Sequence, residues 1–577
     1  MKTNNQMSKL VATAAIALAS VAPSFGQSNL GAACGCPPVS ARTTVTVSTL
    51  PGFVSVPGAA GGELTLGGNW TCDKTYILDQ KIYVNSGSVL VIQPGTIIKG
   101  GALATPSLAT ALIIERGAKI IAAGTQDCPI VFTAAADPMN GTYPMNTVGQ
   151  WGGVVILGKA TNNLTAAKNG TYAPGTGNGR LAVADGLGVI EGFATSVEQD
   201  RFGANISGAV VPGEPAGAVA FDDEDNSGIL KYVSIRHSGA ILAVGNEING
   251  LTLGSVGRGT IIENIETVSC GDDNIEIFGG TVNIKYISVL FGNDDMIDYD
   301  LGWTGKGQFI YGQKSDNTWS PDSDNGFEAD GDDQKSCNLP RATPVFYNVT
   351  MVGNSKTVNT ADNSGQAAIM AKELTGGEIN NSIFANWKSG LILVTSLGTR
   401  TANCSVESYT NWSTAAAAAA GITPILKVKC NTFVNVTNPI ALNTGNSPSA
   451  VSPADNTQFT TTDLNTIVVG NTLPGFDYNS VYNSTANTVT TKNDVVPNPA
   501  LSVTGCPVAP VDGFFVAAPY RGAFASTGDN WLSKWSYSSI LGLTKNTTAC
   551  ASDINKDGVI NVNDFLLFGP LFGTSCN

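Results

Sequence analysis

The segment Asp553–Asp564 has the residue types and spacing of a calcium-binding loop. Oxygen-bearing side chains stand at loop positions 1, 3, 5, 9 and 12, and Gly558 stands at position 6, where such a loop turns sharply. The sequence therefore predicts a Ca²⁺ site formed by the side chains of Asp553, Asn555, Asp557 and Asp564, the carbonyl of Val559, and Asn561 directly or through water. Asp at position 12, where Glu is common, leaves the strength of binding open, and a turn without metal is the alternative.

A second acidic pattern recurs in the middle of the chain. The segment Asp272–Glu276 returns 22 residues later as Asp294–Asp298, and less regularly as Asp324–Glu328. If 22 residues make one turn of a stacked fold, Asp273 lies over Asp295 and the last acids of the two segments also pair, about 4.8 Å apart. Like charges at that distance repel by about 1 kcal/mol in water and by more in a desolvated site.

Three interpretations of this carboxylate ladder remain open: solvated turn residues with Asn274, Asn293 and Asn325, a structural Ca²⁺ site, or catalysis through a raised carboxyl pKa. Glycoside hydrolases pair an acid with a base, whereas β-helix lyases use Ca²⁺ and a basic residue. In the catalytic case, Asp273, Asp295 and Asp298 are the acids and Asp294 is a metal ligand. The sequence does not place a Lys or Arg beside them.

Two further residue types could contribute to a site. The single histidine, His237, ends a strand-like run, and a structural position is favoured over a general base because no partner can be derived. Five tryptophans could stack on sugars if exposed, although packing inside the fold explains each as well. They are Trp151, Trp303, Trp319, Trp387 and Trp531.

Short β-branched runs separated by Gly, Asn and Asp carry these residues. Leu90–Gly100 recurs as Leu112–Ile121, with Gly95 and Gly117 in the same register. A period near 20 built from such runs is typical of a β-solenoid, in which one turn cannot bury its apolar face alone. The predicted fold class is all-β, a right-handed parallel β-helix over residues 75–440 with a small C-terminal calcium-loop module.

The remaining chain divides by composition. Residues 1–26 read as a signal peptide, 27–74 as an N-terminal cap, 441–545 as an Asn/Thr-rich extension with the final turns, and 546–577 as the dockerin-like calcium module. The run Ala415–Ala420 predicts a short helical insert, with a low-complexity spacer as the alternative.

Composition excludes several classes of protein. The chain has 577 residues, of which only 13% are charged, with 45 Asp and Glu against 31 Lys and Arg. The net charge of −14 and the lack of a Lys/Arg cluster argue against a nucleic-acid partner. The 66 glycines and the scarcity of aromatic residues favour short strands and tight turns over a helical bundle.

The first residues resemble an export signal. Lys2 and Lys9 precede the apolar run Leu10–Ala19, which is too short to span a bilayer, and no other run is long enough. The mature protein is therefore expected to be secreted or at the cell surface, without a transmembrane segment; a lipid anchor on Cys34 is a weaker alternative. Export permits disulfides, and the odd number of cysteines, 11, leaves at least one thiol unpaired within the chain. Cys550 and Cys576 form the natural pair of the last module.

Residues 75–545 resemble a family of secreted bacterial parallel β-helix surface proteins. The resemblance lies in Pro94–Thr96, Ala111–Ala118, Gln150–Gly153, Asp222–Ser227 before Tyr232–His237, Glu247–Leu253, and Tyr520–Phe524 ahead of Trp531. It implies the fold and little about activity. The terminal loop resembles one dockerin-type repeat. Dockerins that bind cohesins carry two, so the single repeat puts a cohesin partner in doubt.

Three functions remain open. The leading hypothesis is an exported, calcium-stabilised β-helix protein with a binding or structural role at the cell surface, offering loops on one flank to a glycan or another surface polymer. The second is a polysaccharide-degrading enzyme, a glycoside hydrolase or lyase, that uses the stacked carboxylates. The third is a self-associating adhesin or filament module.

Overall fold

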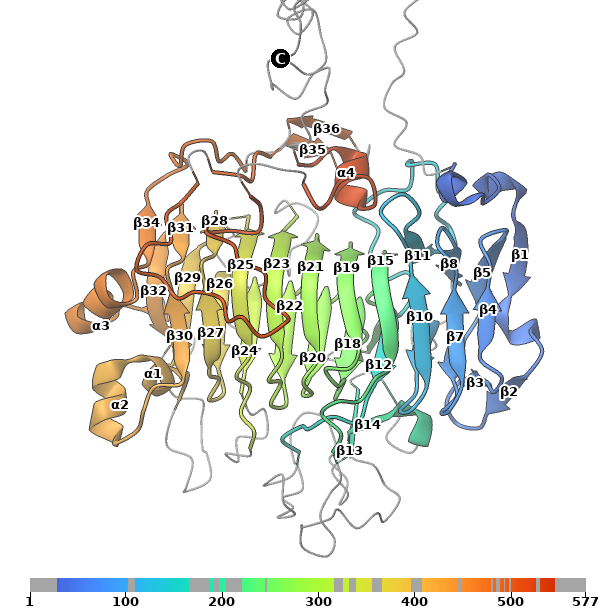
Figure 1. Ribbon diagram of the computed structural model, residues 1–577, viewed down its shortest axis with the longest axis horizontal. Coiled ribbons are helices and arrows are strands. Elements are labelled where there is room, and N and C mark those ends of the chain that lie inside the picture. Colours follow the sequence, from blue (N-terminus) through green and yellow to red (C-terminus); the bar gives the residue numbers. More distant parts are fainter. Residues whose placement is uncertain are drawn as a thin grey trace, which may run out of the picture.

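The parallel β-helix predicted from the sequence is confirmed. The computed structural model describes residues 28–101, 109–164, 187–190, 193, 197–203, 221–243, 246–315, 325–331, 339–354, 366–395, 407–443, 448–478, 481–483, 488–491, 493–497, 500–525 and 530–544. Strands stack in parallel along one long axis, from β1 at one end to β34 at the other (Figure 1). The stacked strands therefore include residues on both sides of the range 75–440.

Two large sheets form the walls of the coil within the described residues. The 13-stranded sheet contains, in spatial order, β2 (Phe53–Val56), β3 (Gly61–Leu64), β6 (Lys81–Val84), β9 (Ala111–Ile114), β12 (Val154–Leu157), β18 (Leu251–Gly254), β20 (Ile275–Phe278), β22 (Ile297–Asp300), β24 (Phe327–Asp330), β26 (Ala367–Lys372), β29 (Ser389–Val394), β32 (Asn438–Asn443) and β33 (Pro448–Ser449).

The 17-stranded sheet contains β1 (Thr43–Thr46), β4 (Gly68–Trp70), β5 (Lys74–Leu78), β7 (Val89–Ile92), β8 (Ile97–Gly100), β10 (Lys119–Ala123), β11 (Ile130–Ala134), β15 (Gly228–Arg236), β19 (Ile261–Val268), β21 (Asn283–Leu290), β23 (Lys306–Gln313), β25 (Val345–Val352), β27 (Gly377–Asn380), β28 (Ile383–Ala385), β30 (Leu426–Lys429), β31 (Thr432–Val434) and β34 (Thr466–Val468). A complete turn alternates between the two sheets.

Small elements lie outside the two sheets. These elements include the antiparallel pairs β13 (Leu187–Val189) with β14 (Arg201–Gly203), β16 (Ile241–Ala243) with β17 (Asn246–Glu247), and β35 (Val481–Asn483) with β36 (Thr488–Thr491). Within the 13-stranded sheet, the end pairs β2–β3 and β32–β33 are also antiparallel. The helices are η1 (Ala32–Cys34), η2 (Val39–Ala41), η3 (Val47–Thr49), η5 (Glu198–Asp200), α1 (Ser408–Trp412), α2 (Thr414–Ala420), α3 (Pro453–Thr457), η6 (Gln458–Thr462) and α4 (Tyr537–Leu541). Helix α2 confirms the helix expected in the alanine run.

The 22-residue spacing found in the sequence equals one turn of the coil in the acidic segments but not in the segments at Leu90 and Leu112. Glu276 pairs with Asp298 in adjacent parallel strands, so 22 residues are one turn there. Leu90 pairs instead with Ile120, while Leu112 lies in the other sheet. The similarity of the segments at Leu90 and Leu112 reflects a strand–glycine–strand unit, because Gly95 and Gly117 both take left-handed φ angles at successive corners, 79° and 81°.

The long strands of the 17-stranded sheet bend at one aligned position. Tyr232, Asn264, Tyr286, Phe309 and Asn348 occupy equivalent places in β15, β19, β21, β23 and β25, and their φ angles lie between 51° and 58°. Asparagine tolerates this left-handed conformation better than most residues. Each long strand is therefore two strands joined at a corner of the coil.

Side chains that alternate along each strand build the core. In β20 and β22, Ile275, Ile277 and Ile297 point into the coil and are fully buried. The same inward rows continue through one apolar cluster that extends from Val47 to Phe459. Outward rows are consequently the positions at which the sequence can place polar or functional groups.

The C-terminal part of the chain returns along the outer face of the 17-stranded sheet. We call residues 500–525 the strap; it crosses the strands of this sheet in Figure 1. Gln308 holds it through two hydrogen bonds of 2.8 Å to the backbone of Val516, and Asn348 donates to the carbonyl of Tyr520. The Cys430–Cys506 disulfide ties the strap to the coil.

Two more disulfides lie near the start of the coil, Cys34–Cys128 and Cys36–Cys72. Because the Cys34 sulfur is bonded to Cys128, a lipid anchor on Cys34 does not fit the structure. Cys270 is a buried free thiol, whereas Cys550 and Cys576 lie outside the described residues. No described helix is long and apolar enough to cross a membrane.

Glu266 fastens the segment that follows the strap. Its buried carboxylate accepts the backbone N–H groups of Tyr537 (2.6 Å) and Ser538 (3.1 Å) at the start of α4. The guanidinium of Arg236 lies 4.2 Å from the Tyr537 ring centroid. Burial raises the pKa of Glu266, and Arg236 opposes this shift.

We expect Glu266→Ala to lower the free energy of unfolding by about 3 kcal/mol, because it strips buried donors of their acceptor and removes a negative charge that acts on buried Arg236. Glu266→Gln should cost less because it keeps an acceptor. Denaturant unfolding measures both changes, and limited proteolysis should show earlier cleavage near residues 530–544 in the alanine variant. An unchanged cleavage pattern would contradict this role for Glu266.

Candidate functional site

An acidic stripe runs across the outer face of the 13-stranded sheet at its middle. Glu276, Asp298 and Glu328 are in register on adjacent strands β20, β22 and β24, two positions before the outward Asp300 and Asp330. They face outward because their neighbours in each strand fill the core. We use the name acidic stripe for Asp272, Asp273, Glu276, Asp294, Asp295, Asp298, Asp300, Glu328 and Asp330.

Asp273 and Asp295 belong to a ladder of side-chain to backbone hydrogen bonds. Asn249 Oδ1 accepts the N–H of Asp273 (3.1 Å), and Asp273 Oδ1 accepts the N–H of Asp295 (2.8 Å). Asp295 Oδ1 then accepts the N–H of Asn325, and Asn325 Oδ1 accepts the N–H of Ala367 at 3.1 Å. These residues link successive turns just before strands of the 13-stranded sheet.

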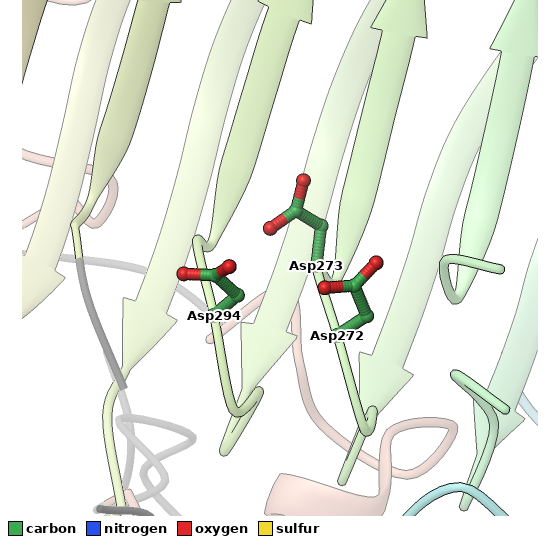
Figure 2. A group of neighbouring side chains, drawn as sticks. All are labelled: Asp272, Asp273 and Asp294. Atoms are coloured by element: carbon green, nitrogen blue, oxygen red, sulfur yellow. The ribbon is translucent and has the colours of Figure 1, made fainter. Parts of the chain in front are cut away.

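The stripe contains three groups of carboxylates that could hold a cation. The oxygens of Asp272, Asp273 and Asp294 lie within 4.8 Å of one another at the turns that enter β20 and β22, where Figure 2 shows them side by side. The carboxylate oxygens of Asp273, Glu276 and Asp298, all buried, are equally close together, and so are those of Asp298, Glu328 and Asp330. Because Asp273 and Asp298 are each shared by two groups, the three form one chain of carboxylates.

Burial and mutual repulsion dominate the electrostatics. Burial, with the neighbouring charges of Asp272 and Asp295, raises the pKa of Asp273 well above its usual value. Burial also raises the pKa of Asp330, although Lys372 opposes this. Lys314 donates to the Asp294 carbonyl, and Lys372 Nζ lies 2.8 Å from Glu328 and 3.4 Å from Asp330.

Lys372 is unsuited to act as a base. Burial alone would lower its pKa, but Asp330 and Glu328 outweigh that effect and raise the pKa well above its usual value. A lysine that keeps its proton cannot abstract one from a substrate. The residue instead places a fixed positive charge at one end of the stripe.

The three predicted catalytic acids come together in space but are shielded. Asp273 is 7% exposed, Asp295 3% and Asp298 6%, and the first two use a carboxylate oxygen in the ladder. The predicted metal ligand Asp294 is partly exposed. The arrangement can hold a cation and stabilise the coil, whereas acid–base chemistry on a polymer requires a carboxyl that touches it.

The histidine and most of the tryptophans are structural. His237 is buried at a corner with φ 58°, and its Nδ1 lies 2.7 Å from the Thr147 carbonyl oxygen. Burial lowers its pKa to about 4, so the ring is neutral at pH 7. Trp151, Trp303 and Trp387 are fully buried. Trp531 is partly exposed, and Trp319 lies outside the described residues.

The predicted ligands of the terminal calcium loop, Asp553, Asn555, Asp557, Val559, Asn561 and Asp564, also lie outside the described residues. Sequence reasoning missed Asn249 and Lys372. Asn249 could have been identified from a five-residue pattern that it shares with the other ladder residues. The pattern begins with Asn or Asp, continues with any residue, and ends with an apolar, a polar and an apolar residue. It starts at Asn249, Asp273, Asp295 and Asn325. No comparable signal marks Lys372, because a long insertion separates it from the preceding turn.

Comparison with known protein families agrees with the fold. A family model for a pectate-lyase-like beta helix domain matches residues 62–192 and 211–466. No curated protein matches the chain significantly. Among solved structures, tailspike protein 2 of Escherichia coli O157:H7 bacteriophage CAB120 is 12% identical, with a TM-score of 0.20, over 71% of this chain and 46% of the tailspike. This chain thus spans less than half of the tailspike.

Two substitutions of Asp295 can distinguish its role as a hydrogen-bond acceptor in the ladder from the effect of its charge. Asp295→Ala should lower the free energy of unfolding by about 1–3 kcal/mol, because the buried N–H of Asn325 loses its acceptor. Asp295→Asn should match or exceed the wild type, since an amide oxygen serves the same purpose in Asn249 and Asn325 and one repulsive charge is removed. Urea unfolding measures both, and equal losses in the two variants would show that the charge matters instead.

Proposed function

Because the chain belongs to the family of pectate-lyase-like β-helix domains, we propose that it is an exported, calcium-stabilised protein that binds a polysaccharide at the cell surface. The family's name supports a carbohydrate ligand. The disulfides near the start of the coil and at the strap suit an oxidising compartment. The low charge and the absence of a Lys/Arg cluster continue to argue against nucleic acid.

The group of Asp273, Glu276 and Asp298 carries the calcium part of the proposal. Its three oxygens lie within 4.8 Å of one another, a separation that oxygens on one Ca²⁺ can have with metal–oxygen distances of about 2.3–2.6 Å. A second observation comes from the adjoining group, where buried Asp330 Oδ1 has no hydrogen-bond partner among the described residues. Repulsion from the neighbouring acids helps to raise the pKa of Asp273, and a divalent cation would relieve that repulsion.

The terminal loop is a separate calcium proposal that rests on its sequence. Its ligand spacing is that of one dockerin-type repeat, and bound Ca²⁺ would order the C-terminal module and stabilise it by linkage. A single repeat is a weak basis for cohesin binding, so we assign this loop a stabilising role.

Binding is favoured over cleavage by the state of the candidate catalytic groups. The predicted acids are buried, Asp273 and Asp295 are engaged in the ladder, and Lys372 keeps its proton. One observation favours the lyase alternative: Asp272 and Asp294, which form a group with Asp273, are partly exposed, so a cation held there could contact a uronate.

We expect a chelator to lower the melting temperature of the full chain in two separable parts. Asp557→Ala should remove the part due to the terminal loop, and Asp298→Asn the part due to the stripe, because each removes a proposed calcium ligand. Differential scanning calorimetry with and without Ca²⁺ measures both. The double variant should melt identically in Ca²⁺ and in chelator.

Asp127→Asn is a suitable control because this exposed acid lies outside the stripe and pairs with an exposed lysine, Lys534. It should respond to Ca²⁺ as the wild type does. If the Asp557→Ala variant alone lost the whole effect, the stripe would hold no calcium; if Asp298→Asn alone lost it, the terminal loop would be empty.

The carbohydrate part predicts retention without cleavage. In affinity electrophoresis, the wild type should be slowed by at least one of polygalacturonate, xylan and hydroxyethylcellulose, and it should release no unsaturated or reducing ends. Lack of retardation by every polymer would sink the proposed function. Product release that Asp273→Asn abolishes at unchanged melting temperature would establish the enzyme alternative instead.

A further inference from the structure

The chain between β12 and β15 contains a short segment that is fastened to the outer face of the 13-stranded sheet. We call residues 197–203, which include η5 and β14, the clasp. The fully buried ring of Phe202 stacks on Phe278 of β20, with ring centroids 6.0 Å apart. The backbone N–H of Gly203 donates to the carbonyl of Gly158, directly after β12, at 2.9 Å. The clasp is therefore seated on the middle of this sheet.

Polar side chains of the clasp also reach the neighbouring strands β3 and β6. Asp200 Oδ1 accepts the hydroxyl hydrogen of Tyr83 on β6 at 2.7 Å, and both residues are fully buried. Gln199 Nε2 donates to Glu63 Oε1 on β3 at 2.6 Å. Seating of the clasp thus brings the Asp200 carboxylate onto a face that already carries Glu63.

A third carboxyl, that of Glu115, lies in the same cluster. It follows β9 and is 7% exposed. Its Oε2 accepts the backbone N–H of Ser86 at 3.2 Å, whereas its buried Oε1 has no hydrogen-bond partner among the described residues. Burial, with the charges of Glu63 and Asp200, raises the pKa of Glu115 to about 8. A neutral carboxyl suits this place, because an anion would be desolvated beside two other acids.

The cations next to these acids do not cancel the effect. Arg116 lowers the pKa of Glu115, but burial and the two acids outweigh it. Lys81 of β6 has its Nζ 4.3 Å from the centroid of the Phe193 ring, and burial lowers its own pKa. The ionisable side chains of the clasp and of the coil next to it include Glu63, Lys81, Tyr83, Glu115, Arg116, Lys159, Glu198, Asp200 and Arg201.

We propose that a proton controls the clasp: it stays seated while the Glu115 carboxyl is neutral and loosens when that carboxyl ionises beside Asp200 and Glu63. Ionisation adds a negative charge next to a segment that itself presents a carboxylate, and repulsion in a desolvated site is several-fold stronger than in water. The inference goes beyond the proposed calcium and carbohydrate binding and does not depend on either.

Loosening of the clasp uncovers apolar surface beside the acidic stripe. Ile113 of β9 and Val155 and Leu157 of β12 are fully buried, in one apolar cluster with Phe202. Phe278 of the same cluster lies two positions after the stripe residue of β20. The clasp therefore makes the apolar area of this face depend on pH.

The sign of the pH dependence follows from linkage between seating and proton binding. A solvated glutamate has a pKa of about 4.3, so between about pH 4.3 and 8 the seated clasp keeps a proton on Glu115 that the loosened state would lose. Seating therefore weakens as the pH rises through this interval, by up to ~10-fold per pH unit for one proton, and levels off above it.

Hydrogen exchange of the full chain, followed by mass spectrometry from pH 5 to 9 and corrected for the intrinsic exchange rate, measures the seating. Protection of peptides that cover the clasp should fall by up to ~10-fold per pH unit and become constant above about pH 8. Glu115→Gln has no proton to lose and keeps an acceptor for Ser86, so its protection should not change with pH. Peptides from β29, a strand without ionisable residues, are the internal control and should show no such trend.

Two further variants separate seating from titration. Tyr83→Phe removes the hydrogen bond to Asp200 and should lower the protection several-fold at every pH without changing its slope. Glu63→Gln removes one charge that disfavours ionisation of Glu115, so the pH at which the protection levels off should move down.

Protection of the wild-type clasp that is independent of pH would overturn the proposal. A pH dependence that persists unchanged in Glu115→Gln would assign the titration to another group, such as Lys81, and would also overturn it. Should Glu115→Gln melt early, Glu63→Gln decides, and an unshifted profile in that variant would overturn the role of Glu115.

Discussion

The parallel pairing of each turn with the next is the constraint on which the rest of this molecule depends. Backbone hydrogen bonds fix the register, so equivalent side chains of successive turns stack about 4.8 Å apart. Apolar residues profit from this, and the inward isoleucines form a continuous core. Charged residues do not, because Glu276, Asp298 and Glu328 are held in line by the same register. In every outward row, side chains of successive turns lie next to one another, and where they carry like charges their repulsion must be offset.

The acidic stripe shows several ways of meeting that requirement. Asp273 and Asp295 accept backbone N–H groups of the next turn, which favours their charged form. Lys372 adds a positive charge beside Glu328 and Asp330. Burial nevertheless raises the pKa of Asp273, which shows that these contacts do not fully offset desolvation and repulsion. A proton or a cation can supply the remainder, and near neutral pH the oxygen ligands favour a cation such as Ca²⁺.

The sequence predicts the strand–corner–strand unit of this fold well, but it predicts only in part how many residues make one turn of the coil. The pairing of Glu276 with Asp298 follows from the 22-residue spacing because no insertion separates their strands. The same spacing misleads at Leu90 and Leu112, since strand, glycine corner and strand recur at every corner of the coil. Lys372 escapes prediction because an insertion hides its register with Asp330. The strap escapes it because irregular chain carries no periodic signal.

The acidic stripe lies on one sheet, but each of its strands is joined to the other sheet within the same turn. Strand β20 carries Glu276, and the chain continues directly into β21 of the 17-stranded sheet. A cation bridging β20 and β22 would restrain the spacing of these turns, and through the short connections it would restrain the strands that follow them. A ligand that binds the folded coil and not the unfolded chain stabilises the coil by mass action. The carboxylates that repel one another in the bare stripe would in that case supply the ligands that hold successive turns together.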